Sequence, residues 1–137
     1  MKIRVLLLLV AAAFCCGANH WESDYPTLSG DYELIGRRFD GGALFAGKMT
    51  IDEVTPNKFS VIRVVDGKKI SGTGRVEYVT PDKLPVFRVS FQEDGKDMEG
   101  TFLYRSDLDN YGRLSGYVYP KNYTGTKPGI EALFIAR

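Results

Sequence analysis

The sequence predicts an all-β protein, an eight-stranded antiparallel up-and-down barrel, with a β-sandwich as the alternative. Apolar and polar residues alternate with a period of two, as in the segment Ile70–Tyr78, where Ile70, Val76 and Tyr78 share the apolar face with two glycines. This period is typical of strands with one buried face. Turn signals about every dozen residues, rich in Gly, Pro, Asn and Asp, separate eight such segments, which is the pattern of a sandwich or a barrel.

Glycines on the apolar face favour the barrel over the sandwich. Gly47, Gly72, Gly100 and Gly116 each fall where the alternation places an inward side chain. An inward glycine allows the sharp coiling that closes a small barrel, whereas a flatter sandwich has less need of it.

The first 18 residues predict a secretory signal peptide. Lys2 and Arg4 precede the apolar run Val5–Phe14, and Ala18 supplies a small residue at a cleavage site. The alternative is a lipid anchor through Cys15 or Cys16, which bulky Phe14 disfavours. We therefore expect a secreted or periplasmic protein that carries no lipid.

The chain without residues 1–18 bounds the class of protein further. About 119 of the 137 residues remain, which is enough for one domain. Both cysteines lie in the removed segment, so no disulfide is expected. The segment also removes two of the 18 basic residues and none of the 17 acidic ones, which leaves a net charge of −1. That balance gives no indication of nucleic-acid binding.

We expect residues 19–27 to form a flexible lead-in and residues 28–137 to form a single barrel domain. The predicted strands, in order, are Leu28–Ile35, Ala43–Val54, Phe59–Val65, Ile70–Tyr78, Val86–Gln92, Met98–Arg105, Arg113–Tyr119 and Ile130–Ala136. Asp66-Gly67 predicts a two-residue hairpin between the third and fourth strands.

Alternation assigns an inward face to most of these strands. The inward side chains are Tyr32 and Leu34, then Phe45, Met49 and Ile51, then Phe87, Val89 and Phe91, then Met98, Phe102 and Tyr104, then Leu114 and Val118. The two faces of Phe59–Val65 are equally apolar, so its inward side stays open. Because these inward side chains are bulky, a filled interior is expected.

The last strand offers two choices of face. One face carries Ala132, Phe134 and Ala136, and the other carries Glu131 with two large apolar residues. An inward Glu131 would be a buried unpaired acid, which is costly. We therefore expect Phe134 inside, and Leu133 and Ile135 outside.

The chemistry of the side chains predicts neither an enzyme nor a cofactor. His20, the only histidine, lies in the lead-in, where nothing positions it for catalysis or metal binding. The segment Asp107–Gly112 has a loose likeness to a calcium loop, but Val118 stands where a bidentate glutamate would be needed. We expect a hairpin turn there and no metal site.

Short motifs carry a resemblance to a known group of barrels. Ser29-Gly30-Asp31-Tyr32 resembles the Gly-x-Trp opening of lipocalins and the similar opening of avidins, with Tyr32 in place of tryptophan. The run Asp109–Gly116 resembles small secreted bacterial barrels of uncharacterised role. The resemblance implies a calycin-type barrel over most of Leu28–Arg137. The chain departs from it in having no opening tryptophan, no disulfide and no helix after the last strand, and no biotin-contacting residues can be matched.

Two kinds of binding site follow. By analogy with lipocalins, one small apolar ligand would bind inside the barrel beside Tyr32, Arg63, Tyr78 and Tyr104, if Arg63 points inward. Arg88 should point outward, because Phe87 and Val89 take the inside.

The second kind of site is a patch on the outer wall. If the last two strands pair, the side chains Ile35, Tyr117, Tyr119, Leu133 and Ile135 form an exposed apolar and aromatic surface. Because a filled interior leaves little room for a ligand, the sequence favours a non-enzymatic protein-interaction module, such as an inhibitor or an envelope partner. Its partner would be another protein or a second copy of the chain, and the small-ligand binder is the alternative.

Overall fold

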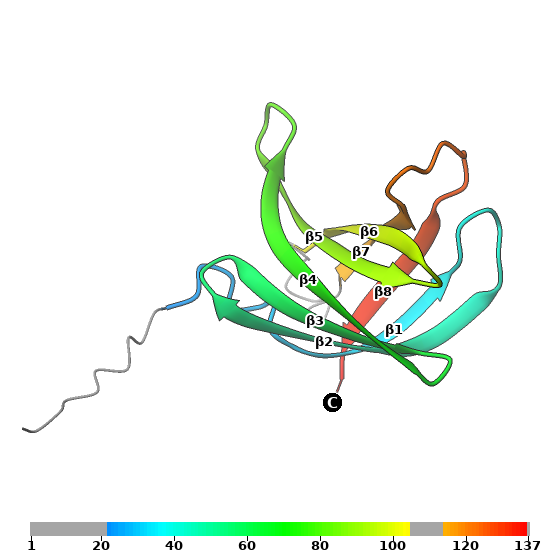
Figure 1. The fold of residues 1–137 in the computed structure, drawn as a ribbon. Helices are drawn as coiled ribbons and strands as arrows, with labels where there is room; N and C mark the ends of the chain where they lie inside the picture. Colours follow the sequence, from blue (N-terminus) through cyan, green and yellow to red (C-terminus); the bar gives the residue numbers. More distant parts are fainter. Residues whose placement is uncertain (1–21, 105–113, 137) are drawn as a thin grey trace, which may run out of the picture.

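The computed structural model describes residues 22–104 and 114–136, which form a closed antiparallel barrel of eight strands (Figure 1). The strands are β1 (Gly30–Arg37), β2 (Leu44–Thr55), β3 (Lys58–Val65), β4 (Lys68–Val79), β5 (Leu84–Glu93), β6 (Lys96–Leu103), β7 (Leu114–Pro120) and β8 (Gly129–Ile135). Each strand pairs with the next along the chain, and β8 closes against β1. The predicted up-and-down barrel is therefore confirmed, and within the described ranges no helix is long and apolar enough to cross a membrane.

Tight turns between the strands set the register. In the β3–β4 turn, Asp66 and Gly67 have φ angles of 52° and 73°. Asp94 and Gly95 in the β5–β6 turn repeat this geometry, with 50° and 74°. Two consecutive positive φ angles characterise the type I′ turn, whose twist matches that of the flanking strands. The hairpin predicted at Asp66-Gly67 is confirmed.

The barrel interior is filled by the inward side chains of the strands. Tyr32, Met49, Phe59, Phe87 and Phe102 are each at most 2% exposed and belong to one apolar cluster. The inward faces predicted for β1, β2, β5, β6 and β7 are confirmed. On β3, whose face was open, the buried set is Phe59, Val61, Arg63 and Val65.

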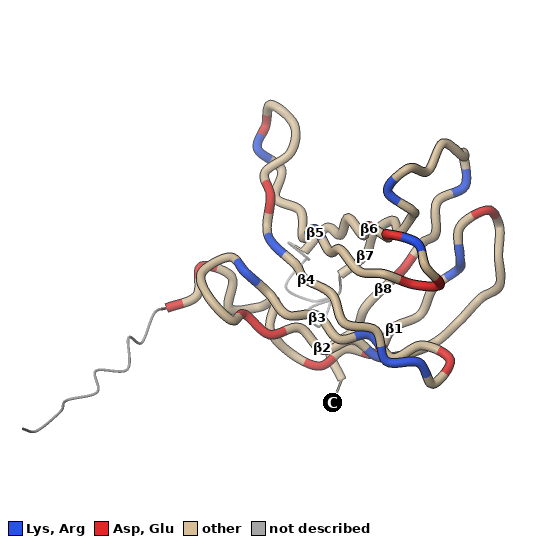
Figure 2. Tube along the Cα trace, in the orientation of Figure 1, with Lys and Arg blue, Asp and Glu red and all other residues tan. Residues whose placement is uncertain are grey.

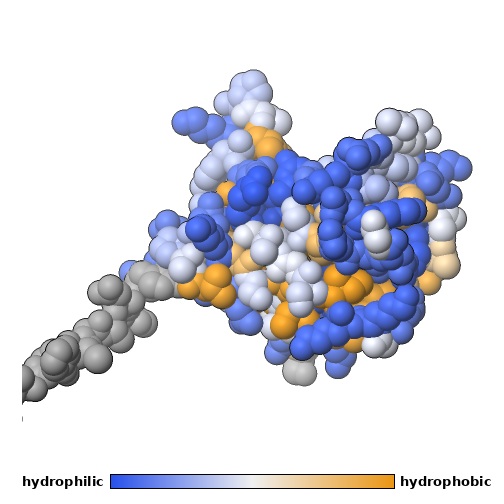
Figure 3. All heavy atoms as spheres, viewed as in Figure 1, coloured by the Kyte–Doolittle hydropathy of each residue, from blue (hydrophilic) through white to orange (hydrophobic). Residues whose placement is uncertain are grey.

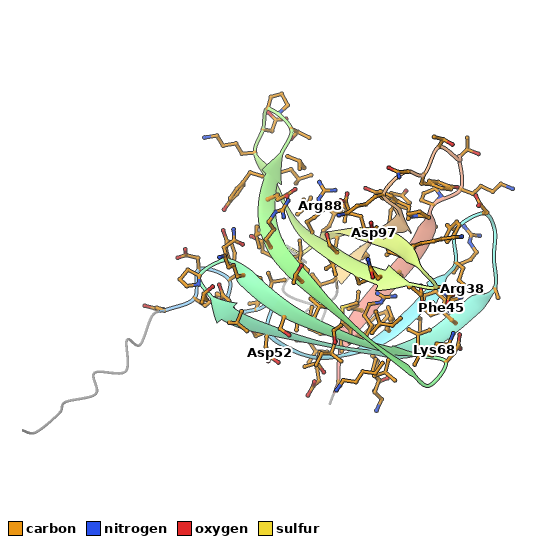
Figure 4. All side chains as sticks on the ribbon, in the orientation of Figure 1. Arg38, Phe45, Asp52, Lys68, Arg88 and Asp97 are labelled. Atoms are coloured by element: carbon orange, nitrogen blue, oxygen red, sulfur yellow. The ribbon has the colours of Figure 1, made fainter. Side chains whose placement is uncertain are left out.

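Each end of the barrel is closed by different contacts. We call the end that holds the β1–β2, β3–β4, β5–β6 and β7–β8 connections the hairpin mouth; it lies on the right in Figure 1. There Arg38 donates hydrogen bonds to Asp66 at 3.0 Å and Glu93 at 3.3 Å, and its guanidinium lies 5.1 Å from the ring centre of Phe45. Figure 4 shows Arg38 and Phe45 side by side at this mouth. One arginine thus ties together three connections.

The opposite end, the N-terminal mouth, is covered by the segment that precedes β1. Tyr25 packs against Phe59 and Tyr104, with ring centres 6.4 and 6.1 Å apart. Leu28 is 1% exposed, and its backbone carbonyl accepts a hydrogen bond from the Tyr32 hydroxyl at 2.9 Å. The described part of the lead-in, residues 22–27, which was expected to be flexible, therefore lies against the barrel through Tyr25.

Candidate functional site

A group of large, exposed apolar side chains lies on the outside of four neighbouring strands. We call this surface the apolar wall; its exposed fractions are Leu44 82%, Tyr117 55%, Ile35 51%, Ile130 45% and Phe134 37%. They come from β2, β7, β1 and β8, which are adjacent in the order β7-β8-β1-β2 around the closed barrel. The rest of the outer surface mixes both signs of charge along the strands and turns (Figure 2). In Figure 3 the visible face is mainly polar, with apolar atoms in separate patches.

The strand register makes the wall continuous. Ile130 lies directly opposite Tyr117 on β7 and Arg37 on β1, and Arg37 in turn lies opposite Leu44 on β2. A shallow depression of about 510 Å³ is lined by Ile35, Leu44 and Ile130, among others. An exposed apolar patch of this kind commonly marks an association site.

Charged residues flank the apolar side chains of the wall. Arg37 is exposed on β1 two residues after Ile35, and Glu33 is exposed two residues before it. Lys48, opposite Glu33 on β2, lies 4.0 Å from the Glu33 carboxylate. The wall therefore has an apolar middle with opposite charges on either side of Ile35 along β1.

The prediction for the faces of β8 was wrong. Glu131 and Leu133 are buried, at 2% and 0% exposed, while Phe134 points outward. The reason is an ion pair that the sequence argument did not consider. Both Glu131 carboxylate oxygens accept hydrogen bonds from the Arg63 guanidinium at 2.7 Å. The buried acid is therefore paired, and the cost that argued against this face is offset.

This reversal changes the membership of the predicted surface. Ile35 and Tyr117 are exposed as expected, whereas Ile135, although exposed, lies opposite inward-facing Tyr32 of β1 and so does not belong to the outer wall. Leu133 is not on the surface at all, and its place is taken by Ile130 and Phe134. Tyr119 is half-buried, with its hydroxyl 3.3 Å from the Glu99 carboxylate, so it belongs to a polar cluster on β6 and β7.

Sequence reasoning missed three members of the wall. Ile130 and Phe134 were missed because β8 was assigned the wrong face. Leu44 was missed because only the inward side of β2 was considered. The alternation that placed Phe45 and Met49 inside also places Leu44 outside, so the signal was present.

The four residues predicted to line a ligand pocket are divided between the two ends of the barrel. Arg63 is 2% exposed near the hairpin mouth, where its guanidinium also lies 4.4 Å from the ring centre of Phe91. The cavity beside it has a volume of only about 20 Å³, which is the scale of a single water site. Among the described residues, the Nε of Arg63 has no hydrogen-bond partner.

The three tyrosines of that set lie towards the N-terminal mouth. Tyr32 is buried, and burial raises its pKa to about 12. Tyr104 is partly buried against Tyr25, whereas Tyr78 is 56% exposed. A hydrogen bond with Tyr78, together with burial, raises the pKa of Tyr25 to about 12. The fold thus gathers Tyr78 and Tyr104 around Tyr25 and keeps them apart from Arg63.

Arg88 lies on the outer face, as predicted. Its guanidinium donates to Glu99 at 2.7 Å and to Glu77 at 3.0 Å. Burial opposes the charge on Arg88, but the hydrogen bond with Glu77 and the charge of Glu99 outweigh it and raise its pKa. Burial opposes the charge on Glu77, but hydrogen bonds from Arg75 and Arg88 outweigh it and lower the pKa of Glu77, which makes this carboxylate a poor candidate for proton transfer.

Comparisons and side-chain clusters give no independent indication of chemistry. The sequence matches no model of a known protein family and no characterised protein. Within residues 22–104 and 114–136, no three His, Cys, Asp or Glu side chains lie close enough to hold a metal ion. His20, the predicted signal segment and the predicted turn Asp107–Gly112 lie outside the described residues.

Proposed function

We propose that this protein is a secreted or periplasmic, non-enzymatic interaction module that binds another protein chain through the apolar wall. The observation that carries the proposal is the continuous exposed surface of Ile35, Leu44, Tyr117, Ile130 and Phe134 on four adjacent strands. Side chains of this size in contact with water favour burial against a partner. The secreted or periplasmic location rests on the signal sequence, and a mature mass beginning near Asn19 without diacylglycerol would support it over an anchor at Cys15 or Cys16.

The charged clusters of the fold support a role without catalysis. The Arg63–Glu131 pair is closed on itself inside the barrel, and Arg88 neutralises the carboxylates around it. An enzyme site needs groups whose protonation is poised near neutrality and that can reach a substrate. These two clusters have the geometry of structural ion pairs instead.

The lipocalin-like alternative, a binder of one small apolar ligand inside a calycin-type barrel, has less support. Two of the residues proposed for it are engaged with the protein itself: Tyr32 with Leu28, and Arg63 with Glu131. A small barrel has room for side chains or for a ligand, and large side chains occupy this one.

Purification from the native source with quantitative mass spectrometry tests the proposal. Tagged parent protein should retain a partner chain that the double variant Ile35→Ser, Ile130→Ser loses. Leu84→Ser is the matched control, because Leu84 is 45% exposed on β5, which β6 separates from β7 and the wall. Identical sets of retained chains in all three proteins would contradict the proposal, and a retained small molecule would favour the lipocalin-like alternative.

A further inference from the structure

The arrangement of side chains on the wall matches the wall of a second copy turned by a two-fold axis. On β8, β1 and β2, the outward side chains form three rows that run across the strands. The middle row is Ala132, Ile35 and Ala46. The rows on either side of it carry opposite charges on β1, so one row can pack against the other row of a second copy.

The two outer rows carry opposite charges at the same position on β1. One row contains Ile130, Arg37 and Leu44, and the other contains Phe134, Glu33 and Lys48. If two walls pack face to face about an axis along the middle row, each row faces the other row of the second copy. Arg37 then meets Glu33, and Ile130 meets Phe134.

The alternative two-fold arrangement is disfavoured by the same charges. An axis parallel to β1 would place each row against its own copy. Arg37 would then face Arg37, and Glu33 would face Glu33. Like charges placed together in an interface repel each other, so they act against this orientation. The charges thus select the packing in which the β1 strands of the two copies run in opposite directions.

The middle row suits close approach of two sheets. Small Ala132 and Ala46 flank Ile35 on both neighbouring strands, so they leave room for the two Ile35 side chains, which meet at the axis. Leu44, the most exposed member of the wall, would lie along the aliphatic stem of the second copy's Lys48. Because the barrel is closed, it offers no free strand edge, and a second copy cannot associate by pairing with an edge strand.

We propose that the occupant of the apolar wall is a second copy of this chain, in an isologous dimer whose two-fold axis passes over Ile35. An isologous interface uses the same patch on both subunits, so each contact between different residues occurs twice. The inference rests on the proposed function, since it names the partner of the same wall.

Charge reversal measured by sedimentation equilibrium tests this arrangement. Arg37→Glu and Glu33→Arg should each raise the dimer Kd by roughly tenfold or more, because each places like charges together at two symmetric contacts. The double variant Arg37→Glu, Glu33→Arg restores opposite charges and should return to within about threefold of the parent Kd. Lys69→Glu, an exposed reversal on β4 outside the wall, should leave the Kd unchanged.

The outcomes separate this inference from the proposed function. A parent protein that stays monomeric at high concentration overturns the dimer. If the parent is monomeric but retains a different protein on purification, and the double variant Ile35→Ser, Ile130→Ser loses that protein, the proposed function stands and only the identity of the partner is wrong. A parent dimer in which neither single reversal weakens association, or in which the double variant fails to recover, overturns the two-fold geometry. Circular dichroism of each variant establishes that it is folded.

Discussion

Arg63 and Glu131 show how two charged residues become part of an apolar core. The guanidinium and the carboxylate meet through two parallel hydrogen bonds, and the ring of Phe91 lies beside the guanidinium. Such a bidentate pair fixes orientation as well as charge. Because Arg63 comes from β3 and Glu131 from β8, the pair joins strands that are not neighbours in the sheet.

Removing one partner of this pair should be strongly destabilising. Glu131→Gln or Arg63→Met leaves the other charge buried without compensation, so we expect a loss of roughly 3–5 kcal/mol in the free energy of unfolding. The double variant Arg63→Met, Glu131→Gln leaves no buried charge and should be more stable than the sum of the single losses indicates. Urea denaturation of the parent, both single variants and the double variant gives the coupling energy. Strict additivity would contradict a direct interaction.

In the sequence analysis, the orientations of Arg63 and Glu131 were considered separately, although each depends on the other. The face of β3 was open because Arg63 could point either way, and β8 was misassigned because an inward Glu131 was treated as unpaired. Alternation within one strand carries no information about which distant strand supplies a partner. Considering whether an inward Arg63 could pair with an inward Glu131 would have resolved both faces and placed Ile130 and Phe134 on the wall.

At the scale of the strands, alternation and turn chemistry predicted most of the architecture. All eight strands lie within a few residues of their predicted bounds, because a half-buried strand repeats its apolar side every second residue. Asp-Gly turns and the short connections then leave few alternatives to an up-and-down order. The inward glycines were also informative, because neighbouring strands approach them closely.

Gly72 on β4 gives the sharpest test of that close approach. A Cβ atom at this position would lie 2.6 Å from the backbone oxygen of Ser90 on β5, where no flexible side chain can move aside. Gly72→Val should therefore destabilise the barrel by roughly 1–3 kcal/mol or more through overpacking. Thr73→Val, at the exposed neighbouring position, is the matched control and should change little. Equal melting temperatures for Gly72→Val and the parent would show that β4 and β5 tolerate a side chain here.

At the scale of the whole molecule, described side chains of the barrel itself lie across both of its ends. Arg38 joins three connections at the hairpin mouth, and Tyr25 with Leu28 covers the N-terminal mouth. The sequence did not predict the packing of Tyr25, because residues ahead of the first strand carry no periodic pattern. Because these side chains occupy the two ends, the proposed function places binding on the outer wall, at Ile35 and its neighbours.

The burial of the Tyr32 hydroxyl near the N-terminal mouth predicts a loss of stability at alkaline pH. Burial raises the pKa of Tyr32 from 10.0 to about 12, so between these values the folded protein keeps a proton that the unfolded chain releases. The unfolded state then binds fewer protons, and the free energy of unfolding falls as pH rises through this window. Stability from this source is complete below pH 10, and its loss by pH 12 amounts to roughly 2–3 kcal/mol.

Tyr32→Phe separates this effect from the general response to alkali. The variant should be less stable than the parent at pH 8, because it loses the hydrogen bond to Leu28, worth about 0.5–1.5 kcal/mol. It should also lack the contribution of Tyr32 to the downward slope between pH 10 and pH 12. Because that contribution is larger than the deficit of the variant at pH 8, the two stability curves should cross within this window. Tyr117→Phe, a matched change on the exposed wall, should follow the parent curve. Parallel curves for Tyr32→Phe and the parent would mean that deprotonation of Tyr32 does not cause the loss of stability between pH 10 and pH 12.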